Sequence, residues 1–139
     1  MGDSRNVQTV REAYAAFGRG DVQGILATLS DNIEWEPVKG TEGVVPHAGT
    51  RRGKPAVEEF FSVLAAHTEF HRFEPREFID GGDTVVVIGA YEATARRTGR
   101  RASSEWVMVF TCADGKITRF REWTDSAALV RAYETLTAA

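Results

Sequence analysis

The segment from Glu69 to Thr124 most constrains the fold, because residues that favour β-strands fill it and three glycine-containing turns divide it. The turns are Gly81-Gly82-Asp83, Thr98-Gly99 and Asp114-Gly115. Short turns of this composition connect antiparallel strands. The segment therefore predicts an antiparallel meander of four long strands at residues 70–79, 84–95, 102–112 and 116–124.

Helical periodicity dominates the start of the chain. Apolar residues recur at steps of three and four in residues 4–17, behind a possible cap at Ser4, which predicts a first helix. Gly18 and Gly20 favour an end to that helix, and Asp21 favours the start of a short second one. The second helix is expected to carry Val22, Ile25, Leu26 and Leu29.

Three more elements complete the expected order. Residues 32–37 alternate in polarity and end at a proline, which predicts a short strand before a Gly-rich loop at residues 38–53. Pro55 suits the first turn of a third helix that ends near His67. Asp125 or Ser126 is expected to cap a last helix. The apolar residues of that helix are Leu129, Val130, Tyr133 and Leu136.

This order of elements predicts one α+β domain over residues 1–139, with helices gathered on one face of a curved sheet and a pocket between the layers. A chain of 139 residues with 42% hydrophobic residues can bury a core of its own. The net charge of −3 argues against a nucleic-acid partner, and no apolar run is long enough to span a membrane. Cys112 is the only cysteine and the first residues lack the apolar run of a signal peptide, so we expect a cytoplasmic protein.

Three segments resemble the NTF2-like superfamily, and within it the SnoaL-like group, which includes ketosteroid isomerase, polyketide cyclases and limonene epoxide hydrolase. Residues 14–38 (YAAFGRGDVQGILATLSDNIEWEPV) resemble the first helices and first strand of the isomerase. Residues 47–61 (HAGTRRGKPAVEEFF) resemble the loop and third helix of the SnoaL-like group, and residues 115–125 (GKITRFREWTD) resemble the last strand of the hydrolase. The resemblance implies a cone-shaped α+β barrel, in which a curved, mostly antiparallel sheet wraps around three N-terminal helices and a central pocket.

The same resemblance implies catalytic candidates. Tyr14 matches the tyrosine that donates a hydrogen bond to the substrate oxyanion of the isomerase, and Glu36 matches its catalytic base. Glu122 matches an acid of the epoxide hydrolase that orients the attacking water. Trp106 stands where the isomerase has a protonated aspartate as its second oxyanion donor. Each of these residues also has a structural interpretation, such as a core tyrosine, a solvated acid at a strand end, or an aromatic wall.

The alternation of side chains along the predicted strands indicates the same pocket independently of the resemblance. In the fourth strand of the meander, a period of two puts Phe120, Glu122 and Thr124 on one face, and the aromatic ring favours the interior. Isolated charge is costly in such a place, so Glu122 should be paired, protonated or bonded to a ligand. Trp35 and Trp123 have the opposite parity and are expected outside the sheet or at a subunit contact. The other residues expected to line the pocket are Glu34, Phe60, Tyr91, Trp106, Met108 and Phe110.

Other polar residues receive structural interpretations. His47 lies in the loop that could close the pocket, where an imidazole could shuttle protons, but the favoured interpretation is an exposed loop histidine. The arginines of residues 96–101 are expected to form a charged hairpin tip. His67, Glu69 and His71 lack the helical spacing of a zinc hydrolase, so we expect no metal. No phosphate-binding or dinucleotide motif is present, so we expect no cofactor.

The outer face of the expected sheet also carries apolar residues, namely Val86, Ile88, Val107 and Val109. An antiparallel sheet with two apolar faces needs cover on both, so we expect a homodimer formed through this outer face.

The expected function is binding of a small hydrophobic molecule, with cofactor-free acid–base chemistry of the isomerase or cyclase type, such as proton abstraction next to a carbonyl. Two alternatives stay open. One is a ligand-binding module without chemistry. The other is water addition of the epoxide-hydrolase type, although Gly89 and Tyr91 stand where that enzyme has its arginine and second acid.

Overall fold

The structure is a computed structural model that describes residues 4–135. In that range the helices are α1 (Arg5–Gly18), α2 (Val22–Leu26), α3 (Lys54–His67) and α4 (Ser126–Tyr133). The strands are β1 (Leu29–Glu36), β2 (Arg51–Arg52), β3 (Thr68–Gly81), β4 (Thr84–Ala95), β5 (Arg101–Ala113) and β6 (Lys116–Thr124). The expected α+β order is confirmed, with β2 as an added short strand. None of the described helices is long and apolar enough to cross a bilayer.

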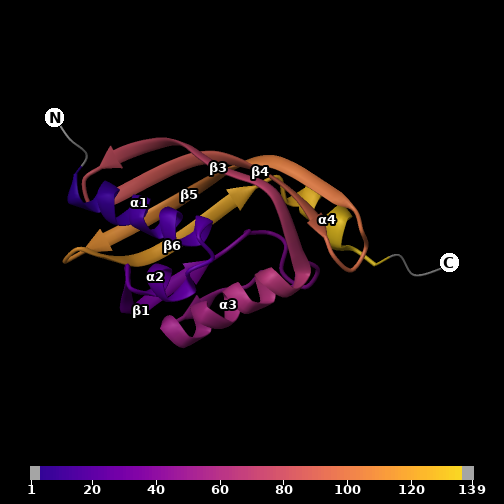
Figure 1. The fold of residues 1–139 in the computed structure, drawn as a ribbon, viewed down its shortest axis with the longest axis horizontal. Coiled ribbons are helices and arrows are strands. Elements are labelled where there is room, and N and C mark those ends of the chain that lie inside the picture. Colours follow the sequence, from indigo (N-terminus) through magenta and orange to yellow (C-terminus); the bar gives the residue numbers. More distant parts are fainter. Residues whose placement is uncertain (1–3, 136–139) are drawn as a thin grey trace.

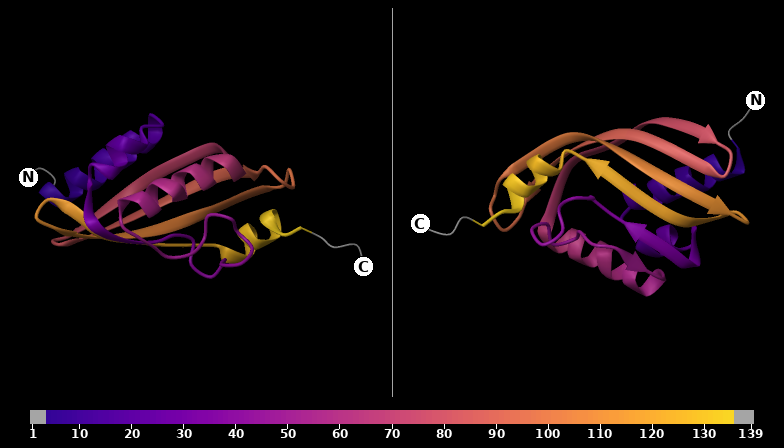
Figure 2. Two further views of the ribbon diagram at one scale, coloured as in Figure 1. Left: turned by 90° about the horizontal axis from the view of Figure 1, so that it is seen from below. Right: turned by 180° about the vertical axis from the view of Figure 1, so that it is seen from behind.

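One six-stranded sheet organises the molecule, in the order β2-β1-β6-β5-β4-β3. The predicted meander forms β3 to β6, in which every neighbouring pair is antiparallel. The sheet is extended by a parallel pairing of β1 with β6. The long strands curve, and α1, α2 and α3 lie on one side of them while α4 lies at the end of the sheet (Figures 1 and 2). The sheet is open, so it forms a cone-like wall rather than a closed barrel.

Side-chain caps begin the helices where the sequence predicts them. Ser4 accepts a hydrogen bond from the backbone N–H of Val7 at 3.2 Å, and Asp21 accepts one from Gly24 at 2.9 Å. Asp125 is the cap of α4 and accepts from Ala128 at 3.1 Å. These bonds satisfy N–H groups that have no partner within a helix. The predicted boundaries are therefore set by local chemistry.

Two leucines were predicted to lie on helices, and the structure tests one of these predictions. Leu29 was expected on the second helix, but it is the first residue of β1 and is 1% exposed. The reason is that α2 ends at Leu26, so Leu29 packs into the core as a strand residue. Leu136, expected on the last helix, lies outside the described residues.

Strand β1 has the opposite phase to the one expected. Ile33 and Trp35 are buried, whereas the carboxylates of Glu34 and Glu36 point to the other face. Trp35 is 5% exposed and stacks on Phe120 with 3.9 Å between ring centroids. The prediction of an outward Trp35 is therefore wrong, because burial of the indole stabilises this strand more than burial of two acids could. Trp123 does lie outside the sheet, with 41% of its surface exposed.

The arginines of the β4–β5 hairpin hold α4 in place. Arg97 donates through Nε to the carbonyl oxygen of Tyr133 at 2.9 Å, and Arg100 donates through Nη1 to that of Glu134 at 2.9 Å. These carbonyls belong to the end of α4, where backbone acceptors lack helical partners. The basic hairpin tip thus holds the C-terminal end of α4 in place through these hydrogen bonds.

Candidate functional site

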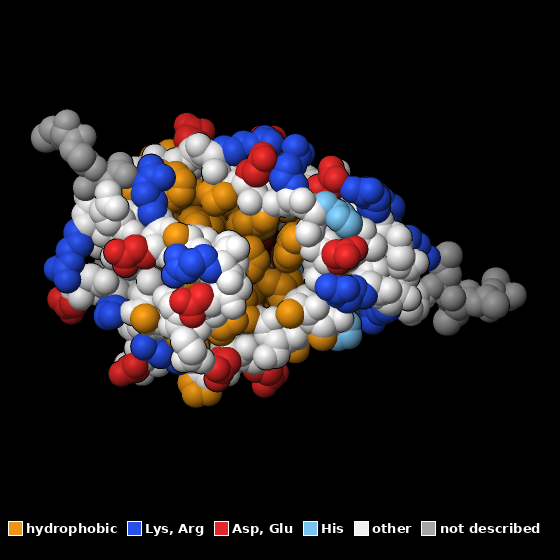
Figure 3. Space-filling model, viewed as in Figure 1, with side chains coloured by type: hydrophobic (Ala, Val, Ile, Leu, Met, Phe, Trp, Pro, Cys, Tyr) orange, Lys and Arg blue, Asp and Glu red, His pale blue; other side chains and the backbone are white. Residues whose placement is uncertain are grey.

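An apolar pocket lies between the concave face of the sheet and the helices that cover it. The space between its lining residues, including open solvent at its mouth, is about 890 Å³. Hydrophobic side chains line a hollow near the centre of the face drawn in Figure 3, and charged side chains surround it. The aromatic residues of the lining include Phe17, Trp35, Phe60, Phe61, Phe70, Phe73, Phe110 and Phe120.

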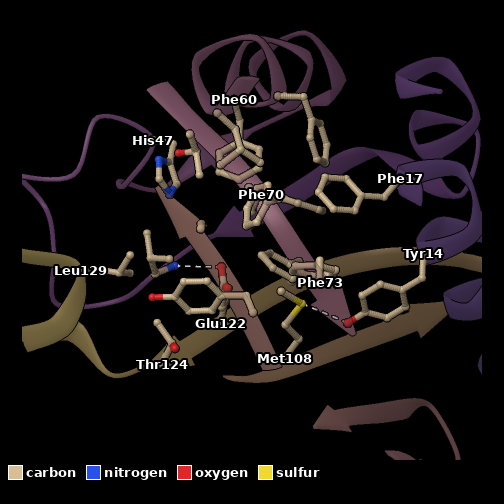
Figure 4. Close-up of a pocket in the computed structure, with 18 of the residues that line it drawn as sticks. Tyr14, Phe17, His47, Phe60, Phe70, Phe73, Met108, Glu122, Thr124 and Leu129 are labelled. Carbon is tan, nitrogen blue, oxygen red and sulfur yellow. Dashed lines mark hydrogen bonds between the residues drawn. The ribbon is translucent and has the colours of Figure 1, made fainter. Parts of the chain in front are cut away.

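Glu122 places a carboxyl group inside this apolar pocket. It projects from β6 as the alternation of that strand predicts, and its Oε1 accepts a hydrogen bond from the backbone N–H of Val38 at 3.2 Å (Figure 4). Within residues 4–135, its side chain has no other hydrogen-bond partner. Burial raises the pKa of Glu122 from 4.5 to about 7, and the N–H of Val38 opposes part of that rise. The group can therefore gain or lose a proton near neutral pH.

Three tyrosines line the pocket with this carboxyl group, and the hydroxyls of two of them have a weak hydrogen-bond acceptor or no partner. The Tyr14 hydroxyl donates to the sulfur of Met108 at 3.0 Å, and a thioether is a weak acceptor. The Tyr91 hydroxyl is buried with no partner among the described residues. Burial, and secondly the Glu122 carboxylate, raise the pKa of both phenols. Both hydroxyls therefore stay protonated and are available as donors to a ligand oxygen.

Most residues of the predicted aromatic and thioether wall lie at the pocket in the structure. The residues that line the pocket as expected are Phe60, Tyr91, Met108, Phe110 and Phe120. Trp106 does not reach the lining. Its indole is 1% exposed and lies behind the wall, stacked on Tyr14 and Phe73 at centroid distances of 5.8 and 5.0 Å. The cause is Gly89, whose missing side chain leaves the space that the Trp106 ring fills.

Glu36 and Glu34, two further predicted site residues, lie outside the pocket. Glu36 accepts from Lys39 Nζ at 2.7 Å and from Arg119 Nε at 2.8 Å. The Lys39 hydrogen bond is the largest cause of a lowered pKa at Glu36, which burial partly opposes and Arg119 reinforces. Glu34 pairs with Arg52 at 2.6 Å. The prediction that these acids face a ligand is wrong, because the phase of β1 points them at cations on the opposite face.

His47 is a pocket residue for which the sequence favoured an exposed position. Its side chain was expected in solvent, yet the residue is 5% exposed and lines the pocket. The ring stands edge-on to Phe60 and Tyr133, at centroid distances of 6.0 and 5.7 Å. The apolar sequence Val44-Val45-Pro46 just before it was the available signal, since Val45 is buried and draws the loop inward.

The polar groups of the pocket do not form a metal site. Within residues 4–135, no group of three or more histidine, cysteine, aspartate or glutamate residues is close enough to hold a metal ion. Glu122 and His47 therefore act as separate polar points in an aromatic cavity. Such a cavity can hold a flat apolar molecule and exchange a proton with it at Glu122.

Comparison with known proteins extends the description. A family model described as a SnoaL-like domain matches residues 10–120. An NTF2-like protein of Burkholderia pseudomallei is 34% identical, with 96% of this chain and 100% of that chain covered and a TM-score of 0.86. An NTF2-like protein of Burkholderia xenovorans is 36% identical, with 96% and 99% covered and a TM-score of 0.84. TerC, crystallised with polyporic acid, is 34% identical, with 95% and 100% covered and a TM-score of 0.84.

Proposed function

Because the chain belongs to the SnoaL-like family, we propose that its pocket binds a small aromatic molecule and acts on it by cofactor-free general acid–base chemistry. The observation that carries the proposal is the Glu122 carboxyl group, which lies in an aromatic pocket with one backbone hydrogen bond and a pKa of about 7. A group that titrates near the working pH is suited to both accept and return a proton.

The proposed chemistry is proton transfer next to a carbonyl, as in an isomerase or cyclase. The Glu122 carboxylate takes a proton from the carbon beside the carbonyl, and the electron pair of that C–H bond moves to give an enolate. Tyr14 and Tyr91 donate hydrogen bonds to the enolate oxygen, which lowers the energy of the developing charge. The protonated Glu122 then returns its proton to another carbon, so the balance needs no further reactant.

The ligand of one relative supports the choice of an aromatic molecule. TerC, of which this chain covers 100%, was crystallised with polyporic acid. We therefore propose that polyporic acid, or an aromatic acid like it, enters this pocket. The seven phenylalanines and Trp35 of the lining offer flat apolar surface for such a ligand.

Calorimetric titration with polyporic acid tests the proposal. An acidic ligand is opposed by ionised Glu122 and accepted by protonated Glu122, whose pKa is about 7. The affinity of the wild-type protein is therefore expected to fall about tenfold between about pH 6 and pH 8. The Glu122→Gln variant, which has no charge to develop there, is expected to keep its affinity over the same range.

Glu36→Gln is the matched control, because Glu36 is the same residue type held by Lys39 and Arg119 outside the pocket. It is expected to follow the wild-type titration, including any change in the ligand's own charge. A tenfold fall that persists in Glu122→Gln would contradict the role of Glu122.

Product analysis separates catalysis from binding alone. With a converted aromatic ketone or enol, kcat/KM is expected to rise as the pH rises through about 7, since the carboxylate of Glu122 is the proton acceptor. Tight binding without conversion of any ketone, enol or epoxide in a panel would instead identify a ligand-binding module without chemistry.

We also propose that a second copy of the chain covers the outer face of the sheet. Ile88, Val107 and Trp123 lie in register across β4, β5 and β6 and form an apolar row on that face. Contact between two such faces would remove the row from water. Sedimentation is expected to give the mass of a dimer, and Val107→Glu to give a monomer that still binds the ligand. A wild-type monomer at micromolar concentration would exclude this contact.

A further inference from the structure

His47 is held in one position by its loop. The Arg51 guanidinium donates through Nη1 to the carbonyl oxygens of His47 and Gly49, each at 2.9 Å. Thr41 is buried in the same loop and donates through its hydroxyl to the carbonyl oxygen of Val38 at 2.7 Å. These bonds, with buried Val45, fix the loop against the pocket. The imidazole is therefore held in a fixed position in the wall of the pocket.

The imidazole of His47 lacks hydrogen-bond partners in the described part of the chain. Among residues 4–135, neither ring nitrogen has a partner, and Nδ1 is completely buried. Burial, followed by the positive charges of Arg51 and His67, lowers the pKa of His47 to about 4, so the ring is neutral near pH 7. A buried polar group without a partner destabilises the folded protein. A ligand that supplied the missing hydrogen bond would remove this cost.

His47 and the catalytic candidates occupy different parts of the pocket. Figure 4 shows His47 and Tyr14 on opposite sides, with Glu122 between them in that view. His47 comes from the loop after β1, Glu122 from β6 and Tyr14 from α1. The space between is lined mainly by aromatic rings, among them Phe60 and Phe70. A ligand that meets both Glu122 and His47 must therefore carry polar atoms at two separated points of an apolar body.

We propose that His47 is a specificity-determining residue, which hydrogen-bonds a second oxygen of an elongated aromatic ligand whose first oxygen meets Glu122. This inference rests on the proposed function and narrows its substrate class to aromatic compounds with oxygen functions at both ends. A neutral imidazole can donate to a carbonyl or phenolic oxygen, and the Arg51 guanidinium beside it favours an oxygen with partial negative charge. A hydrocarbon end, by contrast, would leave His47 unpaired.

Two probes separate the role of His47 from binding in general. One is β-naphthol, and the other is the naphthalene diol with a second hydroxyl at the far end of the ring system. By calorimetry, the wild-type protein is expected to bind the diol about tenfold more tightly, the effect of one added hydrogen bond. His47→Phe keeps the ring and its contacts with Phe60 and Tyr133 but removes both nitrogens. It is expected to bind the two probes with equal affinity.

A second variant and the unbound protein complete the test. His47→Gln restores a side chain that can hydrogen-bond, and it is expected to keep part of the preference for the diol. An unchanged preference in His47→Phe, or an equal loss in both variants, would overturn the role of His47 while leaving the pocket proposal intact. If neither probe bound to the wild-type protein, both the pocket proposal and the inference from it would be wrong.

Discussion

The stability of the wild-type protein relative to the Glu122→Gln variant is expected to fall by about 3 kcal/mol as the pH rises from about 4.5 to about 7. The pKa of Glu122 is raised from 4.5 to about 7 in the folded protein because the pocket removes the carboxyl group from water. Between these pH values Glu122 binds more protons in the folded state than in the unfolded state, so its own contribution to stability falls as the pH rises. Above the folded pKa the slope contributed by this group returns to zero.

Urea denaturation at intervals of one pH unit measures this difference. At pH 8 the Glu122→Gln variant is expected to be more stable than the wild-type protein, and at pH 4 the two should be nearly equal. The gain arises because the neutral amide avoids the cost of a buried charge. Parallel curves for the two proteins over the whole range would show that Glu122 ionises as an ordinary acid, and the proposed proton transfer near neutral pH would lose its basis.

Glu36→Gln is again the instructive comparison, since it should act in the opposite direction. Lys39 and Arg119 lower the pKa of Glu36, so its contribution to stability is present above its unfolded pKa and is lost as the pH falls through the folded value. Glu36→Gln is therefore expected to reduce stability at neutral pH. Glu36 therefore stabilises the fold when it is ionised, whereas ionised Glu122 destabilises it in the proposed ligand pocket.

Local patterns in the sequence were enough for the meander and for the inward direction of Glu122. The glycine turns set the ends of β4, β5 and β6, and in β6 the large ring of Phe120 distinguishes the two faces. The same period of two predicts the positions of Tyr91, Met108 and Phe110 in the pocket lining. In each case the information lies within one strand or one turn, which is why it can be read without knowledge of the fold.

Strand β1 could not be placed in the same way. Its residues Glu34, Trp35 and Glu36 alternate equally well in either phase, and the choice depends on partners far along the chain. Arg119 lies on β6, which meets β1 only through the parallel pairing of the two strands. Trp35 finds Phe120 on the same neighbour. A contact between residues so distant in sequence leaves no periodic signal.

The burial of His47 could not be predicted for a different reason. Loops have no repeating geometry, so the burial of one loop side chain depends on contacts such as those of Arg51 with backbone carbonyls. The apolar residue Val45 indicated that the loop packs on the protein, but not which way the imidazole would point. The pocket's second polar point therefore became visible only with the fold.

Gly89→Ala is expected to lower the free energy of unfolding by about 3 kcal/mol or more, because the added methyl group has no space. A Cβ on Gly89 would lie 2.3 Å from the carbonyl oxygen of Glu74 on β3 and 2.3 Å from the nearest ring atom of Trp106 on β5. The backbone of the central sheet cannot yield easily. The indole cannot yield easily either, since it is buried and stacked on both Tyr14 and Phe73. A loss below about 1 kcal/mol in urea denaturation would contradict this account.

Gly18→Ala is the control for Gly89→Ala, because it makes the same substitution at the end of α1 with no atom within 4 Å of the new Cβ. It is expected to leave stability unchanged or to raise it slightly through helix propensity. The close packing around Gly89 also limits which reaction the pocket could support. Any side chain larger than hydrogen at position 89 would displace the Trp106 ring and, through it, Tyr14, so the arginine of the epoxide-hydrolase pattern has no room here. The packing that positions the Tyr14 hydroxyl in the pocket is thus incompatible with the hydrolase arrangement, and the polar groups that share the pocket with Glu122 include the hydroxyls of Tyr14 and Tyr91.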